Sequence, residues 1–289
     1  MKLASYRVRG RDSFGAVIGK GPGEGVVDLK LRLAPQFTSV LDLLRAGGLD
    51  IARATVRGVR ADFPLRELEF LPPVLQPEKI LGIGINYANR LADFGEAEAP
   101  KYPSLFYRAP GSLVGHQGAI VRPKESEQLD YEGEIALVIG RAGRRIAPSR
   151  ALEHVAGATL CNEGTVRDWL RHGKFNVTPG KNFDASGSIG PWLVTADEID
   201  LSKPLHLTAK VNGEITQDDT TASMIKSFSE LIAYVSTFMT LKSGDIIVTG
   251  TPVKLGPRTE RPTWLKAGDV VEIEVPQIGV LRNTVVAEA

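Results

Sequence analysis

Cysteine is almost absent from this chain of 289 residues, since Cys161 is the only one. A lone cysteine excludes an intramolecular disulfide and every zinc site that needs several thiolates. Long apolar runs are also missing: no segment is apolar for long enough to cross a bilayer, and the first residues lack the core of a secretory signal. A formal net charge of only +1 gives no bulk attraction to nucleic acid or anionic membranes. These absences favour a cytoplasmic enzyme and argue against nucleic-acid and membrane partners.

The chain divides into two parts by pattern. Hydrophobic residues make up 43% and charged residues 24%, which is ordinary for a globular protein. The pattern breaks at a Pro-rich link ending at Pro77, so we predict a small N-terminal β-rich accessory domain over residues 1–75 and a larger domain over residues 76–289. The first part has short strand-like runs and an amphipathic helix predicted over Ser39–Arg45, and it holds no catalytic constellation.

The larger part is dominated by predicted strands. Short apolar runs alternate with Gly, Pro and Asp turns, and helical patterns are few. This pattern predicts a mainly β fold with some α structure (α+β), a sandwich or barrel rather than a doubly wound α/β fold. The predicted strands are Lys79–Ile85, Glu134–Ile139, Leu205–Val211, Asp245–Val248 and Val270–Val275, and the predicted helices are Pro148–Glu153, Thr165–Arg171 and Met224–Met239.

The most informative stretch is acidic and runs from Asp130 into an apolar strand that ends at Gly140. Alternate residues of a strand share a face, so Glu132 and Glu134 point the same way, with Asp130 behind them. Carboxylates side by side at the mouth of a buried strand repel one another and are costly to desolvate. A divalent cation removes that cost, and hard ions such as Mg²⁺ and Mn²⁺ prefer oxygen ligands. The sequence therefore predicts a metal site at Glu132 and Glu134, with Asp130 outside the ligand set.

Several further polar motifs follow in order: Asn162–Trp169, Pro179–Asp184, Gly187–Trp192, Val211–Glu214, Thr249–Pro252 and Ile278–Asn283. Each is weak evidence alone. Together with the paired glutamates they closely resemble the fumarylacetoacetate hydrolase family, in particular its bacterial branch of acylpyruvate hydrolases and 2-hydroxyhepta-2,4-diene-1,7-dioate isomerase-like enzymes. The resemblance covers about Lys79 to Val286, nearly all of the larger part.

The resemblance implies a mixed β-sandwich roll, usually a homodimer, that holds one Mg²⁺ or Mn²⁺ ion through three carboxylates. Glu132 and Glu134 match the paired metal ligands. Glu163 stands where the family more often has aspartate, so the resemblance makes it the third ligand, one methylene longer. Three carboxylates leave positions open on a divalent ion for the oxygens of a small oxo-acid substrate.

The resemblance also implies a set of substrate contacts. Lys181 matches the lysine that approaches the metal-bound oxo acid. Gly250 and Thr251 match the loop whose backbone N–H and hydroxyl bind the substrate carboxylate. Tyr87, from the Asn-Tyr pair before the family's mobile segment, joins the candidate substrate-binding residues. Arg108 is open to two interpretations, as a substrate-binding arginine or as a partner in an ion pair.

One position departs from the family pattern. Many family hydrolases activate water with a His and a Glu after the Asn-Tyr pair, whereas this chain has Arg90 and Asp93 at those positions. Arginine stays protonated in proteins and is a poor general base, but it can bind a second substrate carboxylate bidentately. The base is therefore open between Asp93, His172 and a metal-bound water, and we carry Arg90, Asp93 and Lys181 as candidate catalytic residues.

The leading functional hypothesis is a metal-dependent hydrolase that cleaves a C–C bond in an acylpyruvate or a related 2,4-dioxo acid. The metal would stabilise the pyruvate enolate that leaves when water attacks the distal carbonyl. The alternative uses the same site to isomerise or decarboxylate a 2-oxo-heptenedioate-like diacid from aromatic catabolism, and Arg90 fits that diacid slightly better. A third hypothesis is a non-catalytic protein that binds metal and oxo acid after losing its base.

Overall fold

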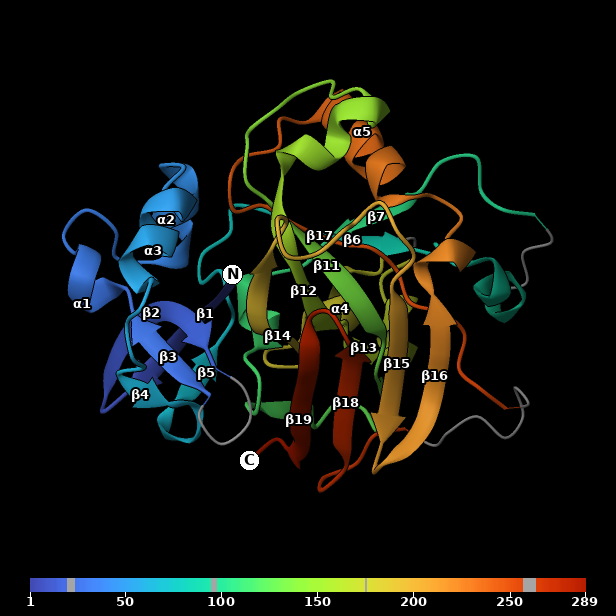
Figure 1. The fold of residues 1–289 in the computed structure, drawn as a ribbon. Coiled ribbons are helices and arrows are strands. Elements are labelled where there is room, and N and C mark those ends of the chain that lie inside the picture. The colour runs from blue at the N-terminus through green and yellow to red at the C-terminus, as the bar shows by residue number, and fades with distance from the viewer. Residues whose placement is uncertain (20–23, 95–97, 175, 257–263) are drawn as a thin grey trace.

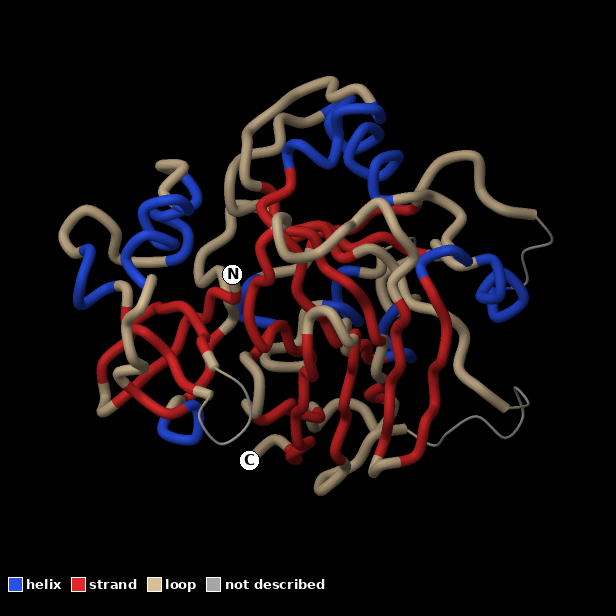
Figure 2. Tube along the Cα trace, in the orientation of Figure 1, coloured by secondary structure: helices blue, strands red, loops and turns tan. Residues whose placement is uncertain are grey.

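Strands hold more residues than helices in this computed structural model, and the predicted α+β class is confirmed (Figures 1 and 2). The structure describes residues 1–19, 24–94, 98–174, 176–256 and 264–289, and for Asp93 and Phe94 it describes the backbone only. Within these residues, no helix combines the length and apolarity that crossing a membrane requires.

The N-terminal part is a small curled sheet with helices beside it, drawn in blue in Figure 1. The helix predicted over residues 39–45 is present, because the Ser39 side chain accepts the N–H of Asp42 at 3.0 Å and caps it. Its elements are β1 (Lys2–Val8), β2 (Arg11–Ile18), β3 (Gly25–Asp28), β4 (Phe63–Pro64), β5 (Glu69–Leu71), α1 (Lys30–Leu33), α2 (Val40–Arg45), α3 (Leu49–Val56) and the 3₁₀ turn η2 (Leu65–Glu67).

A large mixed sheet runs through both parts of the chain, in the order β4-β3-β2-β1-β14-β12-β11-β17-β6-β7. Every residue of its central strands β11, β12 and β14 is buried, which explains their nearly unbroken runs of apolar and small residues. The N-terminal part joins this sheet because β1 pairs with β14, with Lys2 opposite Val194. The strands added here are β6 (Ile80–Gly84), β7 (Ser104–Tyr107), β8 (Leu113–Val114, paired with β14), β11 (Gly133–Ile139), β12 (Val155–Asn162), β14 (Gly187–Thr195) and β17 (Ile246–Val248).

A second sheet, in the order β16-β15-β18-β19-β9, packs on the first and appears in front of it in Figure 2. Its strand β18 alternates buried and half-buried residues, and Val271, Ile273 and Val275 point into the shared core. β18 has the bounds that the sequence predicts for this strand. The members are β9 (Ala119–Arg122), β15 (His206–Val211), β16 (Glu214–Thr220), β18 (Val270–Val275) and β19 (Gly279–Ala287), and a separate pair joins β10 (Leu129–Asp130) to β13 (Thr165–Val166).

The helices differ from their predicted bounds. The helix predicted over residues 165–171 is wrong, because Thr165 and Val166 pair with β10 and only a 3₁₀ turn follows. The helix predicted over residues 224–239 begins later, since Ser227 and Glu230 form a capping box that fixes its first turn. The remaining helices are α4 (Thr178–Lys181) and α5 (Phe228–Phe238), with 3₁₀ segments η3 (Ala88–Phe94), η4 (Pro110–Ser112), η5 (Pro148–His154), η6 (Arg167–Leu170) and η7 (Thr221–Ser223).

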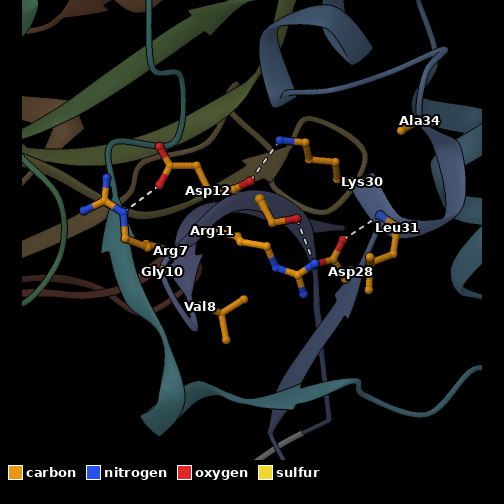
Figure 3. Close-up of a pocket in the computed structure, with 10 residues that line it drawn as sticks. Arg7, Val8, Gly10, Arg11, Asp12, Asp28, Lys30, Leu31 and Ala34 are labelled. Atoms are coloured by element: carbon orange, nitrogen blue, oxygen red, sulfur yellow. Dashed lines mark hydrogen bonds and ion pairs between the residues drawn. The ribbon is translucent and has the colours of Figure 1, made fainter.

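The N-terminal part carries an open groove of about 740 Å³, shown in Figure 3. Its charged groups bind one another: Arg7 donates to Asp12 at 2.7 Å, and Lys30 donates to the backbone oxygen of Asp12 at 2.9 Å. Asp28 accepts the N–H of Leu31 at 2.8 Å. Among the described residues, the one cluster of side chains suited to a metal ion lies outside this groove. The groove therefore lacks the set of carboxylates that the sequence predicts for a metal site.

His116 lies where β5 meets the larger part of the chain. Its ring packs edge-on against Phe70, with centroids 5.2 Å apart, and its Nδ1 accepts the N–H of Arg282 at 3.1 Å. Burial, with a smaller effect of the Arg282 charge, lowers the pKa of His116 to about 4. The neutral ring is therefore the form that fits the fold.

This burial predicts an acid-sensitive contribution to stability. An unfolded chain protonates His116 near pH 6.5 and the folded chain only near pH 4, so stability is full above pH 6.5 and falls as the pH drops towards 4. His116→Gln should remove about 2 to 3 kcal/mol of the loss in unfolding free energy between pH 7 and pH 4.5. Urea unfolding at both pH values measures it. The exposed His172→Gln is the control, and an unchanged pH dependence in His116→Gln would contradict the assignment.

Candidate active site

Three carboxylates meet where β11 and β12 lie side by side, near the centre of Figure 1. β11 pairs antiparallel with β12, with Gly133 opposite Asn162, so the residues flanking this pair converge. Glu132 precedes β11, Glu134 lies on it, and Glu163 follows β12 with its N–H bound to the oxygen of Glu132 at 2.9 Å. One oxygen from each glutamate lies within 4.8 Å of the others, and each side chain is buried.

Cations surround the Glu132 carboxylate. Its Oε1 accepts from Arg167 at 2.8 Å and from Arg90 at 3.1 Å. Its Oε2 accepts from the Thr165 hydroxyl at 2.9 Å and from the Lys181 ammonium. Burial alone would raise the pKa of Glu132, but Arg167, Lys181 and Arg90 together hold it well below its usual range. Glu132 is therefore a fixed negative charge.

The other two glutamates are less well compensated. Burial and then the charges of Glu163 and Glu132 raise the pKa of Glu134 well above its usual range. Burial raises the pKa of Glu163, although Lys181 donates to its Oε2 at 2.8 Å. The Oε1 atom of Glu163 is buried and has no hydrogen-bond partner in the structure. Three buried carboxylates with such an orphaned oxygen are a donor set suited to a hard divalent cation, so these residues fit the metal that the sequence predicts.

The loop after β17 closes over the same cluster. The N–H of Gly250 donates to Glu134 Oε2 at 2.5 Å, and the Thr251 hydroxyl donates to the oxygen of Gly133 at 2.9 Å. Gly250 has φ +100°, and a Cβ there would lie 2.7 Å from the Cβ of Asn86, so glycine is required for this approach. Gln217, from β16, donates to the Thr251 hydroxyl at 2.9 Å. No sequence motif indicates Gln217, because its contact with Thr251 forms only where β16, of the second sheet, approaches the loop after β17.

A cavity of about 270 Å³ opens in front of the carboxylates. It brings together the predicted residues Arg90, Lys181 and Thr251 with the three glutamates, and no histidine is among the described residues that line it. Two further arginines, Arg167 and Arg171, also face it. The lining residues are Ile83, Gly84, Ile85, Arg90, Ser104, Phe106, Glu132, Glu134, Glu163, Arg167, Leu170, Arg171, Val177, Lys181 and Thr251.

Other candidates lie outside this lining. The Arg108 guanidinium is buried and donates to the oxygen of Gly164 at 3.0 Å and to Ser112 and Ser186, so it holds the turn after Glu163. Burial and the nearby Glu134 raise the pKa of Tyr87.

Two candidates for the general base remain, and His172 is not among the described residues that line the cavity. The His172 ring is exposed and stacks on Trp169 with centroids 4.0 Å apart. The Asp93 side chain lies outside the described residues.

Two buried groups behind the cluster escaped the sequence analysis. Arg167 bridges Glu132 and Asp130, and its Nε donates to Asp130 Oδ2 at 2.8 Å. Lys254 donates to Asp130 Oδ1 from the other side. Asp130 is thus bound by Arg167 and Lys254 and is not a member of the carboxylate cluster. The sequence analysis likewise places Asp130 outside the ligand set.

Comparison with known proteins agrees with this site. Residues 79–286 match the family described as fumarylacetoacetate (FAA) hydrolase C-terminal, a span that contains every cavity residue. The chain belongs to the fumarylacetoacetate hydrolase family. The family resemblance predicted from the motifs is therefore confirmed, and with it the identification of the chain as a member of an enzyme family.

Relatives within the fumarylacetoacetate hydrolase family carry different activities in their names. The mitochondrial oxaloacetate tautomerase Fahd2a of Rattus norvegicus is 36% identical over 99% of this chain and 92% of its own length. A fumarylacetoacetate hydrolase of Exiguobacterium antarcticum is 33% identical, with a TM-score of 0.81 over 100% of both chains. A 2-hydroxyhepta-2,4-diene-1,7-dioate isomerase of Mycobacterium marinum is 27% identical, with a TM-score of 0.77 over 100% of this chain and 99% of the other.

Proposed function

We propose that this enzyme forms the enolate of a 2-oxo dicarboxylic acid and interconverts its keto and enol forms. The observation that carries the proposal is the cavity, in which three buried carboxylates meet four cationic side chains. The enolate of a 2-oxo diacid carries one more negative charge than its keto form, so these cationic side chains, together with a bound divalent cation, would stabilise the enolate more than the keto form. The relative named as an oxaloacetate tautomerase supports this substrate class.

Mg²⁺ or Mn²⁺, held by Glu132, Glu134 and Glu163, would supply Lewis-acid stabilisation of negative charge on the 2-oxo oxygen. The ammonium of Lys181, fixed by two of these glutamates, adds a hydrogen-bond donor for the same oxygen. The Thr251 hydroxyl, which donates to the oxygen of Gly133 in this structure, would turn its hydrogen towards the adjacent carboxylate when substrate binds. In oxaloacetate, one proton leaves the carbon between the 2-oxo group and the second carboxylate, and we propose that a water molecule takes it up and returns a proton to the enolate oxygen. Stabilising the enolate is then most of the chemical task.

Hydrolysis of a C–C bond in an acylpyruvate, as the sequence analysis predicts, is the second candidate. The likeness to the Exiguobacterium antarcticum hydrolase favours it. Hydrolysis also requires a base that activates water, whereas Arg90 at the usual histidine position is charged and bound to Glu132. The 2-oxo-heptenedioate isomerase or decarboxylase reaction remains the third candidate, supported by the Mycobacterium marinum relative.

One assay separates the candidates. Purified enzyme is given enol oxaloacetate, an acylpyruvate and a 2-oxo-heptenedioate, each with Mg²⁺, Mn²⁺ or EDTA, and products are followed by ultraviolet absorbance and mass spectrometry. Metal-dependent loss of the enol signal, with no cleavage of the acylpyruvate, supports the tautomerase. Release of pyruvate and a carboxylic acid would instead establish the hydrolase. Equal rates with and without EDTA would reject all three metal-dependent reactions.

Arg171 is predicted to bind the second carboxylate of the diacid. It lines the cavity at the end of η6, its side chain is exposed, and it forms no ion pair with any carboxylate among the described residues. Arg171→Met should raise KM for oxaloacetate by about 10- to 100-fold, the value of a charged hydrogen bond, and leave KM for a monocarboxylic acylpyruvate unchanged. Arg66→Met, at an exposed site on η2, is the control. Equal effects on both substrates would contradict a role in reading the second carboxylate.

We extend the proposal to assembly and domain structure. The family resemblance supports a homodimer, which analytical ultracentrifugation tests directly. The division into residues 1–75 and 76–289 stays a prediction, and limited proteolysis of the Pro-rich link between them tests it.

A further inference from the structure

A chain of alternating charges leads from the proposed metal site away from the cavity. Arg167 donates to Glu132 Oε1 from Nη2 and to Asp130 Oδ2 from Nε, both at 2.8 Å. Lys254 donates to the other oxygen of Asp130, and its Nζ lies 3.9 Å from the ring centroid of Tyr131. The order is therefore lysine, aspartate, arginine, glutamate, and only the last two, Arg167 and Glu132, are among the described residues that line the cavity.

Asp130 and Lys254 do not line the cavity, yet both are nearly inaccessible, at 6% and 7% exposed. Burying such a pair costs desolvation that its attraction barely offsets, so stability alone is a weak reason for its presence. The contact of this pair with Arg167 gives a second reason, which is to fix the position of that arginine. A carboxylate held on one side by Lys254 presents its second oxygen to Arg167 in one orientation.

The same pair also ties the substrate loop to the metal-ligand segment. Gly250 binds Glu134 at the start of the loop, and Lys254 binds Asp130 at its end. Thr251 lies between these two anchors. The loop is thus fastened at both ends to the stretch that contains two of the proposed ligands.

We propose that Asp130 and Lys254 are positioning residues that hold Arg167 against Glu132 and thereby set the metal affinity of the site. The inference rests on the proposed metal site but not on which reaction the enzyme catalyses. Removing only Lys254 or only Asp130 would also change the local charge, which by itself alters cation affinity. A clean test must therefore remove both charges together.

The double variant Asp130→Leu/Lys254→Met keeps the net charge and replaces the pair by apolar groups of similar size. Its dissociation constant for Mn²⁺, measured by the electron paramagnetic resonance of free Mn²⁺ without substrate, should rise by about 10- to 100-fold, because Arg167 keeps its charge beside Glu132 but no longer fixes the orientation of that carboxylate. Activity should return at saturating Mn²⁺. The matched control is Asp245→Leu/Lys79→Met, which removes a pair of a partly buried lysine and a buried aspartate, with Nζ and Oδ2 2.9 Å apart, that does not contact the cluster.

The outcomes are distinct. An unchanged Mn²⁺ dissociation constant in Asp130→Leu/Lys254→Met, or an equal rise in the control, would overturn the inference. Wild-type protein that binds no Mn²⁺ would reject the proposed metal site as well. If the double variant does not fold, Asp130→Glu carries the test, because it keeps every charge but displaces the carboxylate by one methylene, and the same rise is expected. Lys254→Arg, which keeps the donor, should stay within a few-fold of wild type.

Discussion

Glu134→Gln is expected to abolish Mn²⁺ binding and to lower kcat/KM by about 1000-fold, since a metal's Lewis-acid contribution amounts to several kcal/mol. The metal-free protein should be at least as stable as wild type. Burial and the charges of Glu163 and Glu132 already oppose ionisation of Glu134, so a neutral amide of the same shape relieves repulsion. The amide oxygen can still accept the N–H of Gly250.

Thermal unfolding with and without Mn²⁺ measures this prediction alongside direct titration. Mn²⁺ should raise the wild-type midpoint, because a ligand that binds the folded state stabilises it, and should leave that of Glu134→Gln unchanged. Glu153→Gln, at an exposed position on η5, is the control and should behave as wild type. A Glu134→Gln protein that keeps both its Mn²⁺ affinity and its turnover would exclude Glu134 as a ligand.

Lys181→Met is expected to move metal affinity and turnover in opposite directions. The ammonium of Lys181 donates to Glu132 and Glu163, so a positive charge lies against two of the three proposed ligands. Without this ammonium, Mn²⁺ should bind about 10-fold more tightly. Repulsion between the ammonium and the cation in a partly desolvated site costs more than about 1 kcal/mol. Turnover should fall by about 100- to 1000-fold, as when a donor to a developing oxyanion is lost.

Mn²⁺ titration and steady-state kinetics at saturating Mn²⁺ test the two halves separately. Lys79→Met, which removes a partly buried lysine bound to a carboxylate, controls for general destabilisation. Weaker Mn²⁺ binding in Lys181→Met would show that the lysine supports the metal ligands rather than competing with the cation. Full turnover at saturating Mn²⁺ would remove Lys181 from the catalytic set.

The sequence predicted the paired glutamates because their signal is local. Glu132 and Glu134 flank one residue in a strand, and the strand's period of two places them on one face. Glu163 needed the family resemblance, because its approach depends on the antiparallel register of β11 with β12. Sequence spacing alone does not reveal which strands pair.

The groups behind the cluster could not be predicted from local patterns. Lys254 meets Asp130 across more than a hundred residues of chain, and Gln217 reaches Thr251 from a different sheet. The helix predicted over residues 165–171 is wrong for a similar reason, because contacts with distant residues decide the structure of this segment. Thr165 binds both Glu132 and the oxygen of Glu163, and these tertiary contacts favour strand β13 over the helical propensity of the segment.

The position of β7 at the end of the large sheet has a dynamic consequence. β7 pairs only with β6, and its residues Ser104 and Phe106 form part of the cavity wall. An edge strand can separate locally without disturbing the buried strands β11 and β12, so its amide hydrogens should exchange with solvent much sooner than theirs. The β7 wall of the cavity is therefore less protected than the side formed by β11 and β12, and ligand exchange through β7 requires no opening of the core.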